Sequence, residues 1–287
     1  MATDILTAIQ NRMDGFSKGQ KRIANYIAAS YDKAAFMTAS KLGKMVGVSE
    51  STVVRFAVEL GFDGYPSMQK ALQEMVRNKL TSVQRIEVAN DRFGNQDVVS
   101  MVLQSDMESI RLTSEALDRQ VLDQAVEAII RARNIYIVGV RSSAAIATFM
   151  SFYFRNIFDN VRLVNSTSTS EMLEQMLHVG KGDVVIGISL PRYSSRTVKV
   201  LEFAHDSGAE VVVITDSREA PAAKSADHTL VALSDMVSVV DSLVAPMSLV
   251  NALIVAIGRR KEQEMSKIFE NLEQIWEEYE VYERVEA

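Results

Sequence analysis

Apolar residues recur every three or four positions through the first eighty residues, the spacing of helices that bury one face. The pattern predicts helices over 4–13, from Ser17 onward, as a pair within 38–61, and from a cap at Ser67 towards residue 80. No stretch of this part alternates with the period of two that is typical of a half-buried strand. The sequence therefore predicts an all-α domain at residues 1–80.

Residues 38–61 have the pattern of two short helices joined by a tight turn. Gly47 interrupts the apolar spacing where such a turn needs a positive φ, which glycine adopts without a steric penalty. Ser49 can then cap the second helix, and Gly61 can end it. The buried stripes are predicted to contain Ala39, Leu42, Met45 and Val46 in the first helix and Val53, Phe56 and Leu60 in the second.

The second helix leaves a short polar face outside its apolar stripe, close to its N-terminus. This face consists of Glu50, Ser51, Thr52 and Arg55. In a helix-turn-helix protein, that part of the second helix meets the base edges of the major groove. Two amphipathic helices around a glycine turn also occur in helical domains that do not bind DNA, so the pattern by itself leaves both interpretations open.

The charge distribution favours the DNA-binding interpretation. Residues 1–85 contain twelve lysines and arginines against seven aspartates and glutamates, although the whole chain has a net charge of −6. A basic module on an acidic body is typical of a protein that must contact phosphates. We expect base contacts from Ser51, Thr52 and Arg55, with the cap Ser49 beside them. The residues expected to meet phosphates are Lys41, Lys44, Tyr65 and Lys70.

A polar stretch at 81–95, which we interpret as a linker, is followed by two predicted helices, and the pattern then changes at Asn134. Beyond it, short β-branched runs alternate with helix-like segments, which predicts a parallel sheet covered by helices on both faces. The expected strands are 135–138, 161–164, 184–188, 210–214 and 227–231, and the expected helices are 97–116, 119–132, 143–157, 170–177, 195–207, 242–258 and 260–283. The predicted fold class is α/β overall, with an α/β parallel-sheet domain at 96–287 after the helical domain.

Two strand-to-helix loops carry residues that indicate a ligand. In an open parallel sheet, ligands bind beyond the carboxyl ends of the strands, and helix N-termini attract anions. The first loop offers Arg141, Ser142 and Ser143, and the second offers Ser189, Arg192, Ser194, Ser195, Arg196 and Thr197. Serine and threonine are also ordinary helix caps. Two such loops at adjacent strand ends favour a site for an anionic, hydroxyl-rich ligand such as a sugar phosphate.

Several kinds of site are excluded or not expected. The chain has no cysteine, and its three histidines lack the spacing of metal ligands. Neither G-x-G-x-x-G nor a P-loop is present, so we expect no metal and no cofactor.

No signal peptide is evident, and the apolar run at 243–257 is too short to span a bilayer comfortably and contains Pro246. We interpret that run as a buried helix and expect a cytoplasmic protein without membrane contact.

The order of parts resembles the RpiR family of bacterial transcription regulators, in which a helix-turn-helix domain precedes a SIS (sugar isomerase) domain of Rossmann-like fold. The similarity extends over nearly the whole chain and is most specific in the helix-turn-helix string. The matching residues there are Val48 and Ser49, Thr52 to Phe56, Leu60 to Phe62, and Gly64 and Tyr65. It continues in 139–144, in 208–217, at Pro221 and at Ala226 and Asp227.

The resemblance implies a homodimer or homotetramer that binds an inverted-repeat operator in double-stranded DNA. It also implies a sugar-phosphate-like effector, whose phosphate SIS domains hold with the Ser/Thr-rich loops after the first and third strands. Those loops correspond to Ser142 and Ser143 and to Ser189, Ser194, Ser195 and Thr197.

This chain departs from the family pattern at three points. Arg141 stands where glycine is common, Ser195 replaces a glycine in a lengthened second loop, and Ala220 replaces a serine. Together with Arg192 and Arg196, Arg141 would add positive charge to the site. We therefore hypothesise a ligand more anionic than a simple hexose monophosphate: a bisphosphate or a sugar acid phosphate.

Other functions remain open from the sequence. A sugar-phosphate isomerase needs a general base, for which Glu171, Glu174 and His178 are candidates, although solvated helix positions explain them as well. Because no acid–base pair stands out, we do not expect an enzyme. A metabolite sensor acting on protein partners is a third possibility. The C-terminal helix has a stripe that could pack on its own domain or form a subunit interface: Met265, Ile268, Phe269, Leu272, Ile275, Trp276 and Tyr279.

Overall fold

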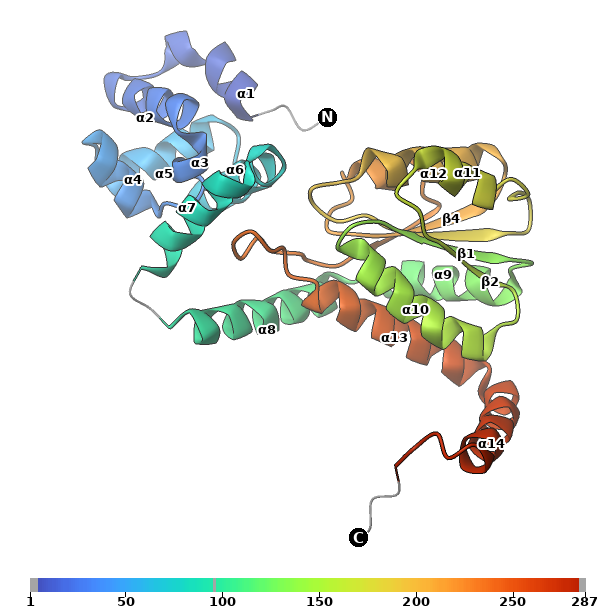
Figure 1. Ribbon diagram of the computed structural model, residues 1–287. Coiled ribbons are helices and arrows are strands. Elements are labelled where there is room, and N and C mark those ends of the chain that lie inside the picture. Colours follow the sequence, from blue (N-terminus) through green and yellow to red (C-terminus); the bar gives the residue numbers. More distant parts are fainter. Residues whose placement is uncertain (1–4, 95–96, 284–287) are drawn as a thin grey trace. The chain divides into compact units, whose positions relative to one another are not determined.

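The computed structural model describes residues 5–94 and 97–283, and the chain divides into two compact units (Figure 1). The N-terminal unit contains Met1–Val102 and also the short segment Met236–Asp241. The C-terminal unit contains Leu103–Asp235 and Ser242–Ala287. The chain therefore passes from one unit to the other at three places, of which only the first follows from the order of the sequence motifs.

The N-terminal unit is helical. Its elements are α1 (Ile5–Asn11), the 3₁₀ turn η1 (Met13–Gly15), α2 (Lys18–Ala29), α3 (Tyr31–Ala34), α4 (Ala39–Val46), α5 (Glu50–Glu59), α6 (Tyr65–Lys79) and α7 (Ser82–Phe93). The predicted cap Ser17 forms a capping box with Gln20 at the start of α2. Ile23, Leu42 and Phe56 are among the side chains fully buried where α2, α4 and α5 pack. Apolar spacing in the sequence thus correctly predicts this core.

Three sequence predictions are wrong in this unit. The stretch 81–95, interpreted as a linker, contains α7, because Thr81 and Gln84 form a capping box and Val88 and Ala89 are buried. Helix α6 begins at Tyr65, before the predicted cap Ser67, with Gly64 at the N-cap position. Met45, assigned to a buried stripe, is 55% exposed.

The C-terminal unit is built on a parallel sheet with strand order β2-β1-β3-β4-β5. The strands are β1 (Ile135–Gly139), β2 (Val161–Val164), β3 (Val184–Ile188), β4 (Glu210–Thr215) and β5 (His228–Val231). All five lie within two residues of their predicted bounds. The strand order reverses between β1 and β3, and such a switch point is where open α/β sheets bind ligands.

Helices cover both faces of the sheet, as predicted. On one face lie α9 (Arg119–Arg131), α10 (Ser143–Ile157) and α13 (Val244–Arg260); on the other lie α11 (Thr169–Gln175) and α12 (Ser195–Asp206) (Figure 1). Ile135 and Ile137 of β1 pack towards the first face, whereas Tyr136 and Val138 pack towards the second. This alternation follows from the two-residue period of a strand.

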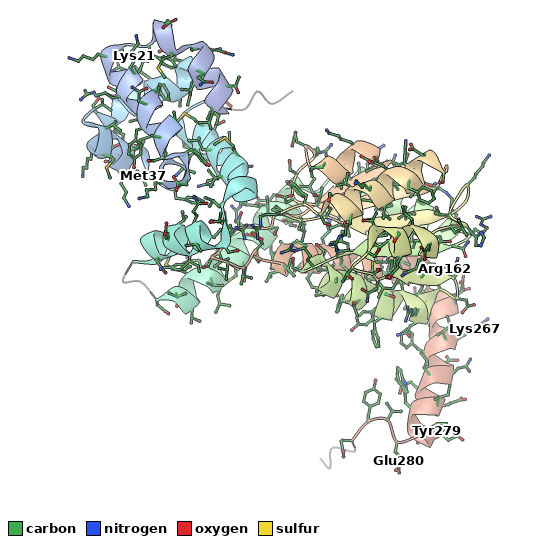
Figure 2. All side chains as sticks on the ribbon, turned by 45° about the horizontal axis from the view of Figure 1, so that its top comes forward. Lys21, Met37, Arg162, Lys267, Tyr279 and Glu280 are labelled. Carbon is green, nitrogen blue, oxygen red and sulfur yellow. The ribbon has the colours of Figure 1, made fainter. Side chains whose placement is uncertain are left out.

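The remaining helices are α8 (Val98–Ala116), the 3₁₀ turn η2 (Pro221–Ser225) and α14 (Glu262–Glu278). The apolar run at 243–257 begins at the N-cap of α13 and continues in that helix, where Leu249, Leu253 and Ile257 are buried. Within the described part of the chain, no helix has the length and apolar content that a membrane span requires. Helix α14, which includes Lys267 in Figure 2, contains no fully buried residue.

Candidate functional site

The second helix of the predicted pair, α5, begins as its sequence indicates. Ser49 has an extended backbone with φ −72°, and its hydroxyl accepts a hydrogen bond from the Thr52 N–H at 3.3 Å. Gly47 lies in the left-handed region with φ 68°. These residues set the turn between α4 and α5, which confirms the predicted cap and the predicted glycine turn.

The outer side of α5 carries the predicted reading residues. Ser51 and Arg55 are exposed and Thr52 is half-buried. The Arg55 Nε–H donates to the Ser51 carbonyl at 3.3 Å, which holds the guanidinium along the helix near its N-terminal turn. Val54 and Val58 are also exposed, and the apolar stripe gave no signal for either. An exposed valine on a reading helix can contact a thymine methyl group.

A cleft of about 530 Å³ lies between α2 and α5. Its lining residues are Ser17, Gly19, Gln20, Arg22, Val48, Ser49, Thr52, Arg55 and Glu59. The Gln20 side chain donates to the Glu59 carboxylate, and this bond fixes the start of α2 against α5. Two arginines, one glutamate and the N-terminal turns of two helices thus border one polar cleft, whose arginines and helix N-termini can interact with an anionic group.

Arg22 is a cleft residue that sequence reasoning missed. It comes from α2, outside the helix-turn-helix pair, and a Cβ built on Gly47 would lie 3.2 Å from Arg22 Nη1. The guanidinium is therefore next to the turn between α4 and α5. Its place depends on the packing of α2, so no short sequence window reveals it.

The residues expected to meet phosphates divide into two groups. Lys41, Lys44 and Lys70 are exposed. Tyr65 is only 3% exposed, and its hydroxyl donates to the Met37 carbonyl at 2.6 Å. Burial also raises the pKa of Tyr65 to about 12, so the hydroxyl keeps the proton that it donates. The expectation that Tyr65 contacts DNA is therefore corrected, and the residue instead ties α6 to the chain before α4.

The two predicted effector loops leave neighbouring strands at the switch point of the sheet. Gly139, the last residue of β1, pairs in register with Ile188, the last residue of β3. The first loop leads into α10 and the second into α12. A Cβ on Gly139 would lie 2.7 Å from the Ser143 carbonyl oxygen, which shows how closely α10 begins against β1.

Three hydroxyl residues of these loops are buried: Ser143, Ser189 and Thr197. Ser189 is 2% exposed, and its Oγ has no hydrogen-bond partner among the described residues. A buried hydroxyl without a protein partner is uncommon and calls for a specific explanation. A polar ligand at the switch point would supply such a partner.

The other predicted effector residues lie nearer the surface. Arg141, Ser142, Arg192, Ser195 and Arg196 are exposed, and Ser194 is half-buried. Ser142 and Ser194 occupy the N-cap positions of α10 and α12, yet neither side chain makes a cap bond. The alternative that these serines serve as ordinary caps therefore has no support from the geometry. Arg141 has φ 57°, which turns the chain sharply before α10.

Thr215, Tyr193 and Asp216 join the strand-end site although they were not predicted as site residues. The Thr215 hydroxyl donates to the Ser189 carbonyl at 2.7 Å, and the Tyr193 hydroxyl donates to Asp216 at 2.8 Å. These bonds connect the second loop to the end of β4. These residues could have been predicted only from the strand order, which places β4 next to β3 and which the fold alone reveals.

The acid–base candidates of the isomerase interpretation do not form a catalytic pair with one another. Glu171, Glu174 and His178 are all exposed, and Glu171 accepts a hydrogen bond from Ser166. No group of three potential metal ligands of the His, Cys, Asp or Glu type occurs within residues 5–94 and 97–283.

Comparison with known proteins assigns both units. The helix-turn-helix domain of the rpiR family matches residues 3–79, and the SIS domain matches residues 128–256. The chain joins an rpiR-family helix-turn-helix domain to a SIS domain. This is the domain order of RpiR-type transcriptional regulators, and it confirms the resemblance stated above.

The chain is also similar to a curated transcriptional regulator and to two solved structures. The HTH-type transcriptional regulator HexR of Pseudomonas aeruginosa is 27% identical over 215 residues, which cover 74% of this chain and 73% of HexR. NanR of Vibrio vulnificus, solved in complex with ManNAc-6P, is 20% identical, with a TM-score of 0.59 over 95% of this chain and 97% of NanR. The sugar isomerase domain of an RpiR transcription factor from Sphaerobacter thermophilus is 27% identical, with a TM-score of 0.59 over 62% of this chain and 99% of that domain.

Proposed function

We propose that this chain is a DNA-binding transcriptional regulator whose operator affinity is controlled by a phosphorylated sugar or a related anionic sugar metabolite. The observation that carries the proposal is the exposed polar side of α5 in a helix-turn-helix domain that is joined to a SIS domain. The relatives named as transcriptional regulators support it. An isomerase with an accessory helical domain is not proposed, because the geometry favours no acid–base pair.

The DNA interface follows from α5 and its surroundings. Ser51, Thr52 and Arg55 are proposed to contact bases from the major groove, with Ser49 at the start of the helix beside them. Lys41, Lys44 and Lys70 are proposed to contact phosphates. Arg22 joins them, because it borders the same cleft as Arg55. These contacts would set the register of the reading helix on the duplex.

The effector is proposed to bind at the strand ends. The buried hydroxyls of Ser143, Ser189 and Thr197 would accept or donate hydrogen bonds at the phosphate, assisted by the helix N-termini. Ser142, Ser194 and Ser195 lie on the same two loops. Arg141, Arg192 and Arg196 supply a further positive charge, which favours a sugar acid phosphate or a bisphosphate over a neutral sugar. The ManNAc-6P complex of NanR supports the class of phosphorylated sugars.

We propose that the protein is cytoplasmic and assembles as a homodimer or homotetramer. This assembly would bind an inverted-repeat operator in double-stranded DNA. A palindromic operator presents two identical half-sites, which a two-fold symmetric protein can occupy with two reading helices. Helix α14 offers an apolar stripe without a fully buried residue, and Tyr279, at its C-cap position, is 71% exposed (Figure 2). A shift of quaternary state by the effector would change the spacing of the reading helices.

The proposal is tested by measuring binding of the full chain to DNA that flanks its own gene, at two salt concentrations. A panel of glucose 6-phosphate, 6-phosphogluconate, fructose 1,6-bisphosphate and N-acetylmannosamine 6-phosphate is added to each. Salt-sensitive, specific binding that one compound alters is the expected result. Binding of DNA in no condition would contradict the regulatory function. Responses from glucose 6-phosphate or N-acetylmannosamine 6-phosphate alone, with 6-phosphogluconate and fructose 1,6-bisphosphate silent, would contradict the more anionic effector.

A further inference from the structure

The segment Met236–Asp241 forms a tight hairpin between β5 and α13, and it belongs to the N-terminal unit rather than to the unit of its flanking residues. Met236 and Asp241 pair as an antiparallel bridge, and the Val237 N–H donates to the Val240 carbonyl at 3.1 Å. We call this segment the 236–241 hairpin. It is a feature of the chain that neither the helix-turn-helix motif nor the strand-end loops account for.

A buried ion pair anchors the 236–241 hairpin within the N-terminal unit. Arg85 of α7 is 2% exposed and donates from Nη2 to Asp241 Oδ1 at 2.8 Å and from Nη1 to Oδ2 at 3.1 Å. Met236 is buried in the helical core. A guanidinium that is buried this completely needs its partner, because an unpaired buried charge is strongly unfavourable. The ion pair therefore holds the hairpin to α7, and Met236 adds apolar burial in the helical core.

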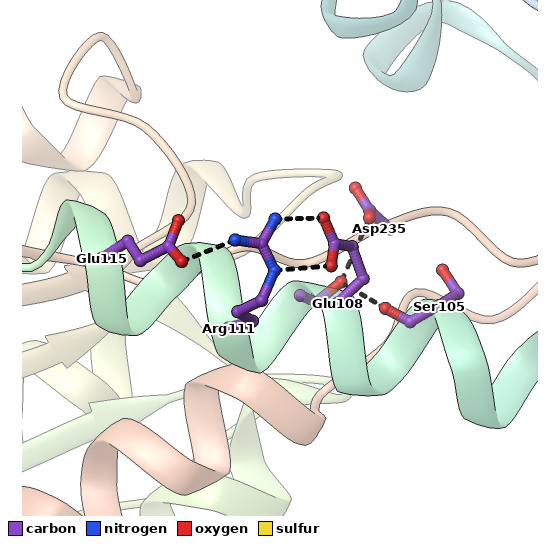
Figure 3. A network of polar contacts seen from close by, with 6 residues as sticks. Ser105, Glu108, Arg111, Glu115 and Asp235 are labelled. Atoms are coloured by element: carbon purple, nitrogen blue, oxygen red, sulfur yellow. Dashed lines mark hydrogen bonds and ion pairs between the residues drawn. The ribbon is translucent and has the colours of Figure 1, made fainter.

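The residues at the base of the hairpin are fixed just as firmly within the C-terminal unit. The Ser242 N–H donates to the Asp235 carbonyl at 2.8 Å, and the Ser242 hydroxyl donates to Asp106 of α8 at 2.6 Å. The Ser109 hydroxyl, also on α8, donates to the Asp235 carboxylate at 3.2 Å (Figure 3). Both ends of the hairpin are therefore hydrogen-bonded to residues of the C-terminal unit.

The same segment is connected by hydrogen bonds to the strand-end site. The Thr215 hydroxyl donates to the Ser189 carbonyl at 2.7 Å, and the Ala232 N–H donates to the Thr215 carbonyl at 2.8 Å. The next residue, Leu233, donates its N–H to Thr113 of α8 at 3.0 Å. Only two residues then separate Leu233 from Met236. A continuous set of bonds thus leads from an effector loop to the hairpin.

We propose that the 236–241 hairpin transmits the state of the strand-end site to the helical unit, with the Arg85–Asp241 ion pair as its anchor. The proposal rests on the proposed function, because it names the way in which the effector regulates DNA binding. Effector contact at Ser189 displaces Thr215, which is hydrogen-bonded to Ser189, and Thr215 in turn displaces Ala232. The displacement reaches the 236–241 hairpin, which transmits it to α7. Coupling between sites requires such an element that both sites bias.

The test compares full-length wild type with Arg85→Gln, Asp241→Asn and the double variant. The double variant removes both charges, so it avoids the unpaired buried charge that can prevent either single variant from folding. The control is Arg111→Gln, because Arg111 forms exposed ion pairs with Glu108 and Glu115 on α8 (Figure 3). Two quantities are measured by titration: the affinity for the most effective compound of the sugar-phosphate panel, and the operator affinity with and without it.

In the double variant, the affinity for the compound should stay within about twofold of wild type, and so should the operator affinity without compound. The change in operator affinity caused by the compound should fall at least fivefold, whereas the control keeps the full change. An undiminished change in the double variant would overturn the proposal, although the proposed function would stand.

If no compound of the panel alters operator binding by the wild type, the effector control in the proposed function fails, and the hairpin is tested without ligand. Thr215→Val removes the hydroxyl that donates to Ser189. It should change amide hydrogen exchange in α7 at least threefold in the wild-type background and leave it unchanged in the double variant. Equal exchange in α7 with and without Thr215→Val would overturn the proposal.

Discussion

The proposed reading surface on α5 and the proposed strand-end site differ in how far apart in the sequence their parts lie. On α5, the cap bond joins Ser49 to Thr52, and the Arg55 bond reaches Ser51, so each contact spans three or four residues. The strand-end site instead combines loops near 141, 192 and 216, which parallel pairing of β1, β3 and β4 places side by side. The first site is a property of local structure, whereas the second exists only in the folded sheet.

The largest expected effect comes from Gly139→Ala, which alters the strand-end site and leaves α5 unchanged. The new Cβ would lie 2.7 Å from the Ser143 carbonyl oxygen, which α10 holds in place. We expect a loss of about 3 kcal/mol in unfolding free energy of the C-terminal unit, together with at least a tenfold loss of effector affinity. Denaturant unfolding and effector titration measure the two quantities.

Gly15→Ala is the matched control, because nothing lies within 4 Å of its new Cβ. Its effect should stay within about 0.5 kcal/mol. A Gly139→Ala protein as stable as the control would show that α10 can move away from β1 at little cost.

Arg55→Ala alters the proposed reading surface on α5. If Arg55 makes a bidentate contact with a guanine, its loss should weaken specific operator binding by about 1–3 kcal/mol and leave effector binding unchanged. Arg119→Ala, an exposed arginine at the start of α9, is the control and should not affect DNA binding. Operator affinity that stays at the wild-type value would remove Arg55 from the reading surface.

Acid should destabilise the sheet from the end opposite the effector loops, where Asp183 precedes β3. Burial raises the pKa of Asp183, but bonds from Arg133, Asn134 and the Gly180 N–H outweigh it, so the net pKa lies below its ordinary 3.8. A lowered folded pKa gives stability that is complete above the unfolded pKa and is lost as pH falls through the folded one. Unfolding free energy should therefore decline below about pH 4.

Asp183→Asn should reduce this acid dependence and cost about 1–3 kcal/mol at neutral pH, because the neutral amide is a weaker acceptor for the same donors. Unfolding followed from pH 3 to pH 7 measures both effects. A variant with the full wild-type acid dependence would assign the decline to other carboxylates, such as Glu210.

The smallest expected effect is that of Lys44→Ala. A phosphate contact carries no sequence information, so operator DNA and unrelated DNA should lose affinity by the same small factor. The slope of log affinity against log salt concentration should fall by about 0.9. Lys181→Ala, in the C-terminal unit, is the control. A loss confined to operator DNA would instead place Lys44 at a base.

Sequence patterns predicted most of the fold. The strands lie within two residues of their predicted positions, because buried β-branched runs between helical segments have few alternative structures. The prediction of a linker at 81–95 was wrong. The stretch is polar, but the capping box at Thr81 and the burial of Val88 stabilise α7 there. The prediction that Tyr65 contacts DNA was wrong for a related reason. A tyrosine after a turn can face solvent or the core, and only the packing of the folded domain decides between them.

The sequence by itself determined the domain order, the glycine turn at Gly47, the cap at Ser49 and the two loops that meet at the switch point. These features depend on backbone preferences and on hydrophobic period, which act over a few residues. Only the tertiary structure decided that Arg22 borders the cleft, that the buried Ser189 Oγ has no hydrogen-bond partner among the described residues, and that Asp241 pairs with Arg85. Such contacts join residues far apart in the chain, and their energies depend on burial and register that no short window contains.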